Sequence, residues 1–206
     1  AAIDKYIYIT YHRSKFDKRI RLRYSKMEEV DNLDEIQNEI VRETLRFCDI
    51  KDSIELTSHA EIPSGTGLGS SGSFGVGILH ALMPKVSGAK LAKGASYIQM
   101  DVLHFPCGLQ DQYVAAFGGV NVYKIHENGS GKEDEVSPLK TDANVLGQNL
   151  ALFFTGLKRD ANEVLATQRE KSEDPQMIET LHKTQELCYK VKEVLQKGEF
   201  RKFGEF

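Results

Sequence analysis

Pro63-Ser-Gly-Thr-Gly-Leu-Gly-Ser-Ser-Gly-Ser73 joins a strand-like run at residues 54–62 to an apolar, helix-compatible run at residues 74–82. Its glycines permit backbone angles that other residues avoid, and they let a ligand come close to the main chain. Its serines stand where a helix would begin, and the free N–H groups and positive dipole end of a helix attract anions there. The stretch therefore fits a phosphate cradle and equally a flexible Gly/Ser turn, and its composition alone does not choose between them.

Three familiar nucleotide-binding loops do not account for this stretch. A Walker A loop needs a lysine directly before a serine or threonine after its last glycine, and the stretch has none. Gly67-Leu-Gly-Ser-Ser-Gly72 satisfies the dinucleotide pattern GxGxxG, but residues 73–100 contain no acid to hold a ribose. The protein-kinase motifs VAIK, HRD and DFG do not follow either. A phosphate cradle here would have to be of another kind.

Composition describes an ordinary globular chain. Its 206 residues are 40% hydrophobic and 28% charged, with a formal net charge of -3 at pH 7. The basic cluster at residues 13–26 contains Arg19-Ile-Arg-Leu-Arg-Tyr24, whose alternation is typical of the solvent face of an antiparallel strand. No apolar run approaches membrane-spanning length. We therefore expect neither nucleic acid nor a membrane as a partner. Three widely spaced cysteines argue against a disulfide framework and suit the reducing cytoplasm.

Hydrophobic periodicity predicts alternating strands and helices along the chain. Aromatic and β-branched residues predict strands at 6–11 and 19–24, and the short polar link between them predicts a hairpin. Further strands are expected at 54–62, 120–125, 136–139 and 150–155, the last of them buried, with an Asn-Gly turn at 128–129. Helices are expected at 34–48, 72–83, 90–103, 109–117, 161–170 and 176–197.

Two of these helices carry features that packing must explain. Gly75 and Gly77 lower the helix propensity of the 72–83 helix, so close packing or a bound ligand must compensate. The 176–197 helix has an apolar stripe that is more typical of a core than of a cofactor site. Its members are Ile178, Leu181, Cys188, Val191 and Leu195. Because the chain turns helical toward its end, a domain boundary is expected near residues 142–148. Its abrupt start without methionine indicates a piece of a longer protein.

The glycine stretch also resembles a known family signature. Pro63-x-x-x-Gly-Leu-Gly-Ser-Ser71 is similar to the signature loop of the GHMP kinases, which include galactokinases and homoserine, mevalonate and phosphomevalonate kinases. Residues 2–9, 106–119 and 154–159 are similar to the branch of bacterial sugar kinases that includes D-glycero-D-manno-heptose 7-phosphate kinase. These blocks occur in order along essentially the whole chain.

The resemblance implies an α+β fold of two layers, with an antiparallel or mixed sheet covered by helices. Residues 1–145 would form the GHMP kinase N-terminal, ATP-binding domain without its first motif. Residues 146–206 would then begin a largely helical C-terminal domain that is incomplete in this chain. The family's third glycine-rich motif would follow residue 206.

The implied activity is that of a cytoplasmic kinase that uses ATP and Mg²⁺. It would transfer the γ-phosphoryl group to a hydroxyl group of a sugar or sugar phosphate similar to heptose 7-phosphate. The resemblance leaves open whether the protein forms a homodimer. One alternative keeps the fold as a weakened or non-catalytic nucleotide-binding module. Another gives it the acceptor specificity of a galactokinase or mevalonate kinase, and a third, a structural interaction domain, would bind no ATP.

Kinase chemistry needs a phosphate cradle, a metal and a carboxylate near the acceptor hydroxyl. Asp111 matches the family's catalytic aspartate, although an acid at a helix start often has a purely structural role. Asp101 and Glu61 are weaker candidates, because no family position supports them. Ser71 matches the serine that helps to hold Mg²⁺, a role compatible with capping the helix. The residues implied to bind ATP are Pro63, Gly65, Gly67, Leu68, Gly69, Ser70, Ser71, Gly72 and Ser73.

Two positions depart from the family pattern. Gln99 stands where related kinases place a glutamate that completes the Mg²⁺ site, and an amide oxygen can coordinate a metal but brings no negative charge. We therefore expect weaker Mg²⁺ binding or compensation by another acid. Leu109 replaces a residue that is often lysine, so a contact to a substrate phosphate would be lost. Arg159 and Gln112 are implied to contact the substrate, and Arg159 could equally be a solvated charge at a helix start.

Overall fold

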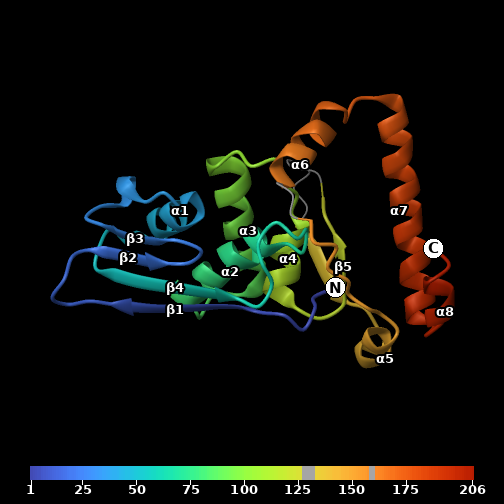
Figure 1. Ribbon diagram of the computed structural model, residues 1–206. Coiled ribbons are helices and arrows are strands. Elements are labelled where there is room, and N and C mark those ends of the chain that lie inside the picture. The colour runs from blue at the N-terminus through green and yellow to red at the C-terminus, as the bar shows by residue number, and fades with distance from the viewer. Residues whose placement is uncertain (127–132, 158–160) are drawn as a thin grey trace. The chain divides into compact units, whose positions relative to one another are not determined.

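The computed structural model describes residues 1–126, 133–157 and 161–206 (Figure 1). It contains both sheets and helices, and the predicted α+β fold class is confirmed. The chain divides into two compact units. The sheet unit comprises Asp4–Phe117 and Leu157–Asn162, and the C-terminal unit comprises Ala1–Ile3, Gly118–Gly156 and Glu163–Phe206. The domain boundary that we place at residues 145 and 146 stays a prediction.

The sheet unit is built on four strands in the order β1-β4-β2-β3. The strands are β1 (Ile7–Arg13), β2 (Ile20–Arg23), β3 (Met27–Val30) and β4 (Ile54–Ala60). Strand β4 pairs antiparallel with β1 and parallel with β2, and β2 pairs antiparallel with β3. The predicted hairpin between β1 and β2 is therefore wrong, because β4 lies between them. The hairpin forms instead between β2 and β3, where Tyr24 N donates to Lys26 O at 2.9 Å and closes the turn.

The alternation in β2 separates a buried face from a charged one. Ile20 and Leu22 are 0% and 1% exposed, and they contribute to the core between the sheet and the helices. Arg21 and Arg23 alternate with them and reach carboxylates on neighbouring strands, including Glu55 at 3.0 Å from Arg23. The basic cluster is thus the solvent face of a strand, as predicted, and its charge is balanced by acids.

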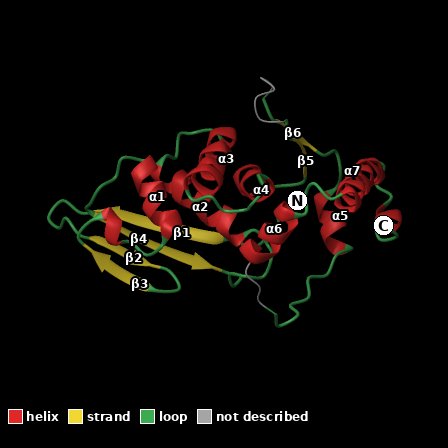
Figure 2. Cartoon of the chain, turned by 90° about the horizontal axis from the view of Figure 1, so that it is seen from above, coloured by secondary structure: helices red, strands yellow, loops and turns green. Residues whose placement is uncertain are grey.

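Helices gather on one side of this sheet, as Figures 1 and 2 show. They are α1 (Glu39–Phe47), α2 (Ser70–Leu82), α3 (Gly88–Ser96) and α4 (Gln110–Phe117), with a 3-10 turn at Leu33–Glu35 and a π-helical turn at Tyr97–Val102. Helix α1 starts at Asn38, whose side chain accepts a hydrogen bond from Val41 N at 3.1 Å. Helix α2 contributes Ile78 to the core against the sheet and Leu79 to a second core against α3.

Close packing accounts for the glycines within α2. A Cβ atom on Gly77 would lie 3.1 Å from Cγ1 of Ile9 in β1, and one on Gly75 would lie 2.7 Å from Nε2 of Gln99. Helix α2 therefore approaches both the sheet and the π-helical turn more closely than side chains would allow. The loss of helix propensity at these glycines is compensated by contact, as the sequence required.

The C-terminal unit contains a two-stranded antiparallel sheet and several helices. The elements are β5 (Asn121–Lys124), β6 (Glu135–Pro138), α5 (Ala143–Gln148), α7 (Pro175–Gln196) and α8 (Phe200–Phe203), with α6 (Ala161–Glu170) running across the division between the units. The side chain of Asp174 caps α7 by accepting from Gln176 N at 2.8 Å, and Pro175 occupies the first turn. The predicted turn at Asn128-Gly129 lies outside the described residues.

Two predictions of burial in this unit are wrong. Residues 150–155 form no strand, and Leu152, Phe153 and Phe154 are 66%, 82% and 65% exposed. In α7 only the end of the apolar stripe is buried, at Leu195, whereas Ile178 is 41% exposed. Apolar periodicity tells which face of an element is suited to burial, but a second element must cover that face. Among the described residues, no helix has the length and apolar character needed to cross a membrane.

Candidate functional site

The glycine loop adopts the backbone that its sequence favours. Gly65, Gly67 and Gly69 have φ angles of +79°, +77° and +68°, in the left-handed region that other residues rarely enter. Gly69 is the N-cap of α2, and Ser73 N donates to Gly69 O at 3.0 Å in the first turn. No side chain caps this helix and no acid lies in its first turn, so its N-terminal N–H groups and dipole are open to an anion.

Asp111 lies against this loop although 42 residues separate it from Gly69 in the sequence. It stands in the first turn of α4, which packs on α2. A Cβ atom on Gly69 would lie 3.0 Å from Cγ of Asp111, and one on Gly72 would lie 2.8 Å from its Cβ. The two glycines therefore leave the space that the carboxylate-bearing helix occupies. The structure brings together the two features that the sequence singled out.

The environment of Asp111 changes its acidity. The residue stays accessible to solvent, but the surrounding protein excludes water from part of its carboxyl group. This desolvation raises the pKa of Asp111 above its ordinary value, because the charged form loses hydration. Among the acids considered from the sequence, Asp101 is exposed in the π-helical turn. Glu61 accepts from Tyr6 N at 2.7 Å and so helps to hold the chain just before β1.

Gln99 and Gln112 form a buried amide pair beneath the loop, and each is 1% exposed. Gln99 Nε2 donates to the carbonyl oxygen of Ser71 at 3.1 Å, so its Oε1 is left to accept. In one orientation of its amide, Gln112 donates from Nε2 to Gln99 Oε1 at 2.8 Å. In this orientation Gln112 Oε1 faces the carbonyl oxygens of Gly108 and Leu109. When the amide is turned over, its Nε2 donates to these oxygens at 3.0 and 3.2 Å, and its Oε1 faces Gln99. In both orientations the buried amide of Gln99 contacts Ser71 and Gln112, and its role as a metal ligand stays a prediction.

The remaining predicted residues are placed differently. Ser71 is exposed at the start of α2, and Leu109 is half-buried just before α4. Arg159 lies outside the described residues. In the described ranges, no group of three or more His, Cys, Asp or Glu side chains could hold a metal ion.

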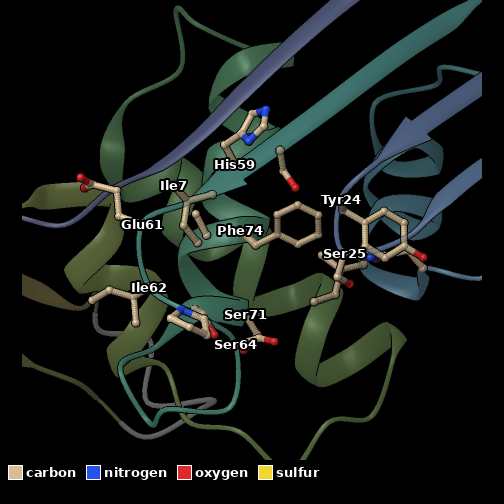
Figure 3. Close-up of a pocket in the computed structure, with 15 residues that line it drawn as sticks. Ile7, Tyr24, Ser25, His59, Glu61, Ile62, Ser64, Ser71 and Phe74 are labelled. Carbon is tan, nitrogen blue, oxygen red and sulfur yellow. The ribbon is translucent and has the colours of Figure 1, made fainter. Parts of the chain in front are cut away.

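A cavity of about 660 Å³ lies beside the loop within the sheet unit (Figure 3). In the view of Figure 3, Ser64 and Ser71 lie at its lower edge, below the rings of Tyr24 and Phe74. Asn38, at the start of α1, also lines it. Sequence reasoning did not assign Tyr24, Asn38 or Phe74 to the site. Phe74 directly follows the glycine stretch and was within reach of that reasoning, whereas the other two carry no local signal.

Glu28 in β3 organises one wall of this cavity. Its Oε1 accepts from the hydroxyl group of Tyr24 at 2.6 Å and from Asn38 N at 3.2 Å. Burial and then the carboxylate of Glu28 raise the pKa of Tyr24 to about 12, so the phenol stays neutral and donates. One carboxylate therefore fixes residues from β3, the β2–β3 turn and the start of α1 around the same space.

A glycine-rich loop that opens a helix, a carboxylate against it and a cavity beside it are the parts expected of a nucleotide-dependent transferase domain. Residues 35–119 match the family model described as the GHMP kinases N terminal domain. The chain contains a GHMP kinase N-terminal domain, and the resemblance seen in its sequence is confirmed.

Named relatives agree with this assignment. The chain is 31% identical over 178 residues to D-glycero-alpha-D-manno-heptose 7-phosphate kinase of Campylobacter jejuni, covering 83% of this chain and 51% of that protein. It is 28% identical over 177 residues to the galactokinase of Pyrococcus furiosus, covering 77% and 47%. The chain thus spans about half the length of the curated relatives that it matches.

Solved structures support the fold. The crystal structure of a D-glycero-D-manno-heptose 1-phosphate kinase from Bacteroides thetaiotaomicron superposes with a TM-score of 0.60. The sequence identity is 24%, and the match covers 70% of this chain and 51% of that one. At this identity the likeness speaks for the fold alone.

Proposed function

We propose that this chain is the nucleotide-binding part of an ATP-dependent sugar kinase. It would transfer the γ-phosphoryl group of ATP to a hydroxyl group of a sugar or sugar phosphate similar to heptose 7-phosphate. The observation that carries the proposal is the contact of Asp111 with Gly69 and Gly72 at the open start of α2. The sugar kinases among the relatives support the acceptor class.

The loop supplies the site for the phosphate groups. Phosphoryl transfer depends mainly on positioning and on stabilising negative charge, and the loop offers main-chain N–H groups at a helix start whose own first turn contains no acid. Seven residues of the predicted ATP site, Gly65 and Gly67 to Gly72, span the left-handed loop and the first helical turn. The cavity beside Ser70 and Ser71 is large enough for the remainder of a nucleotide.

Asp111 is proposed as the group that acts on the acceptor. Its carboxylate would accept a hydrogen bond from the acceptor hydroxyl, orient it toward the γ-phosphorus atom and take its proton during transfer. Its raised pKa is consistent with this role, because a more basic carboxylate accepts a proton more readily. The oxygen–phosphorus bond then forms as the bond from the γ-phosphorus atom to ADP breaks.

Magnesium belongs to the proposal as a companion of the nucleotide. Mg²⁺ is usually held by one or two protein oxygens together with substrate phosphates, and it offsets their negative charge. Ser71 is exposed beside the cavity, so its side-chain oxygen fits this requirement. Gln99 fits it less well, because it is 1% exposed and its amide is packed against Ser71 and Gln112. A cytoplasmic location and a homodimer remain predictions.

Replacement of Asp111 in the whole protein tests the proposal. Asp111→Ala should lower kcat by at least about 100-fold, since a positioned acid–base group contributes roughly 10²- to 10⁴-fold. Binding of ATP, followed by calorimetry, should change little. Asp101→Ala is the matched control, because it removes an exposed acid close in sequence and should leave turnover intact. Turnover of Asp111→Ala within a few-fold of the wild type would refute the assigned role.

The second candidate is a nucleotide-binding module without turnover. It is favoured by the buried Gln99, which brings no negative charge to the loop. Such a module would bind ATP in calorimetry yet show no ATP consumption with any member of a panel of sugars and sugar phosphates. Turnover with a single member of that panel would exclude it.

A further inference from the structure

We propose that Gln99 is a positioning residue: with Gln112, it holds the helix that carries Asp111 against the anion-binding start of α2. This inference rests on the proposed function. It assigns to the amide of Gln99 a mechanical role within the protein in place of contact with a metal.

The backbone around Gln99 is shaped to direct its side chain inward. Gln99 lies in the π-helical turn, where the widened helix ends with Leu103 N donating to Ile98 O at 2.9 Å. Phe105 N donates to Gln99 O at 2.8 Å, and His104 between them has a φ angle of +57°, which is costly for a residue other than glycine. π-Helical turns occur frequently at functional sites. The segment that contains the strained residue His104 also carries the buried amide of Gln99.

The two hydrogen bonds of Gln99 join the parts of the site. Ser71, whose carbonyl oxygen accepts from Nε2, belongs to the first turn of α2. Gln112, whose amide lies 2.8 Å from Oε1, directly follows Asp111 in α4. The amide of Gln99 can donate to Ser71 at one end while its other end contacts the amide of Gln112. A carboxylate could still accept from Gln112 but would face the carbonyl oxygen of Ser71 with a second acceptor. The neutral residue suits this position for a chemical reason.

Space confirms how tightly the bridge is built. A Cβ atom on Gly75 would stand 2.7 Å from Nε2 of Gln99, and one on Gly72 would stand 3.1 Å from the main-chain nitrogen of Gln112. Both residues are on α2, one turn apart, and both leave room for the amide pair and its helix. Helix α4 can move away from α2 only if this contact loosens.

Two replacements of Gln99 in the whole protein separate the possibilities. Gln99→Met keeps the length of the side chain and removes both hydrogen bonds, so it should lower kcat by about 10- to 100-fold, as expected for a small displacement of a reacting group. The KM for ATP should stay within about three-fold. Gln99→Glu keeps the acceptor and loses the donor, so it should also lower kcat, and added Mg²⁺ should not restore it. A gain in Mg²⁺-dependent rate with Gln99→Glu would overturn the proposal and make Gln99 a position for metal binding.

A matched control and a readout without turnover complete the test. Thr44→Val alters another fully buried polar side chain, one without a hydrogen-bond partner, and should leave kcat unchanged. The pKa of Asp111, followed by carbon-13 NMR without substrate, should move back toward its ordinary value in Gln99→Met as the carboxyl group gains water. An unchanged pKa in that variant would overturn positioning by Gln99, whether or not the protein proves to be a kinase. Absence of turnover in the wild type would instead count against the proposed function.

Discussion

The sheet unit and the C-terminal unit use their apolar residues in opposite ways. In the sheet unit, Ile78 and Leu79 of α2 are each 0% exposed, and they join the helix to two cores. In the C-terminal unit, Phe153 and Phe154 are 82% and 65% exposed in a segment without regular structure. A site that depends on contacts of 3 Å needs the first kind of surroundings. The candidate residues Gly69, Gly72 and Asp111 all belong to the sheet unit.

The largest effect should come from removing core atoms in the sheet unit. Ile78→Ala should reduce the free energy of unfolding of this chain by about 2–5 kcal/mol, since it deletes buried carbon atoms and leaves a cavity. Phe153→Ala should change it by less than about 0.5 kcal/mol, because an exposed side chain has little contact to lose. Urea unfolding of the two variants measures both values.

The same two variants can contradict this contrast in burial between the two units. Equal losses in this chain would mean that residues 150–155 are covered. A loss above about 2 kcal/mol for Phe153→Ala in the whole protein alone would show that the apolar segment is buried there, as the sequence pattern predicts.

Glycine replacements offer a second, smaller contrast between the units. Gly72→Ala places a Cβ atom 2.8 Å from the Cβ atom of Asp111, so α4 must shift, and stability should fall by about 1–3 kcal/mol together with turnover. Gly147→Ala in α5 meets no atom within 4 Å, and it should raise stability by about 0.4–1 kcal/mol by restricting the unfolded chain. Thermal unfolding and kcat are the measurements. Full turnover in Gly72→Ala would show that α2 and α4 need not touch.

Local patterns determined much of the fold. The glycine stretch predicted the start of α2, because the left-handed backbone at Gly69 can be expected from glycine alone. Strand partners were not predictable in this way. Propensity identified β1 and β2, but it could not reveal that β4, from a later part of the chain, inserts between them. The π-helical turn was also missed, since one extra residue per turn hardly alters an apolar pattern.

The candidate site likewise contains residues that a local sequence signal identifies and residues that only the fold brings together. Asp111 and the loop could be chosen because each has a local signal and a family resemblance, and the structure places them together. The cavity wall at Tyr24 and Asn38 could not, since those residues meet only through Glu28 and the order of the strands. The hydrogen bonds of Gln99 were hidden for a related reason, because sequence shows the residue type but not which way its amide faces.

The smallest predicted effect concerns charge, and it has opposite signs in the two units. Burial raises the pKa of Asp111, so the folded state binds its proton more tightly than the unfolded state. Ionised Asp111 therefore costs stability once the pH rises above its unfolded pKa. In α7, hydrogen bonding to Lys197 lowers the pKa of Glu193, so ionised Glu193 adds stability above its unfolded pKa, which is lost as the pH falls through the folded value.

Two variants that replace a carboxylate by an uncharged amide measure these opposite effects on stability. At pH 7, Asp111→Asn should raise the melting temperature and Glu193→Gln should lower it slightly, because one removes an unfavourable charge and the other a favourable one. Both differences should vanish at acid pH, where the two carboxyl groups are protonated in the folded and unfolded states alike. If Asp111→Asn lowered the melting temperature at pH 7, the carboxylate would have a stabilising partner in solution. The contact with Gly69 and Gly72 would then stabilise the ionised carboxylate of Asp111, and the carboxylate would not be destabilised by desolvation before the substrate binds.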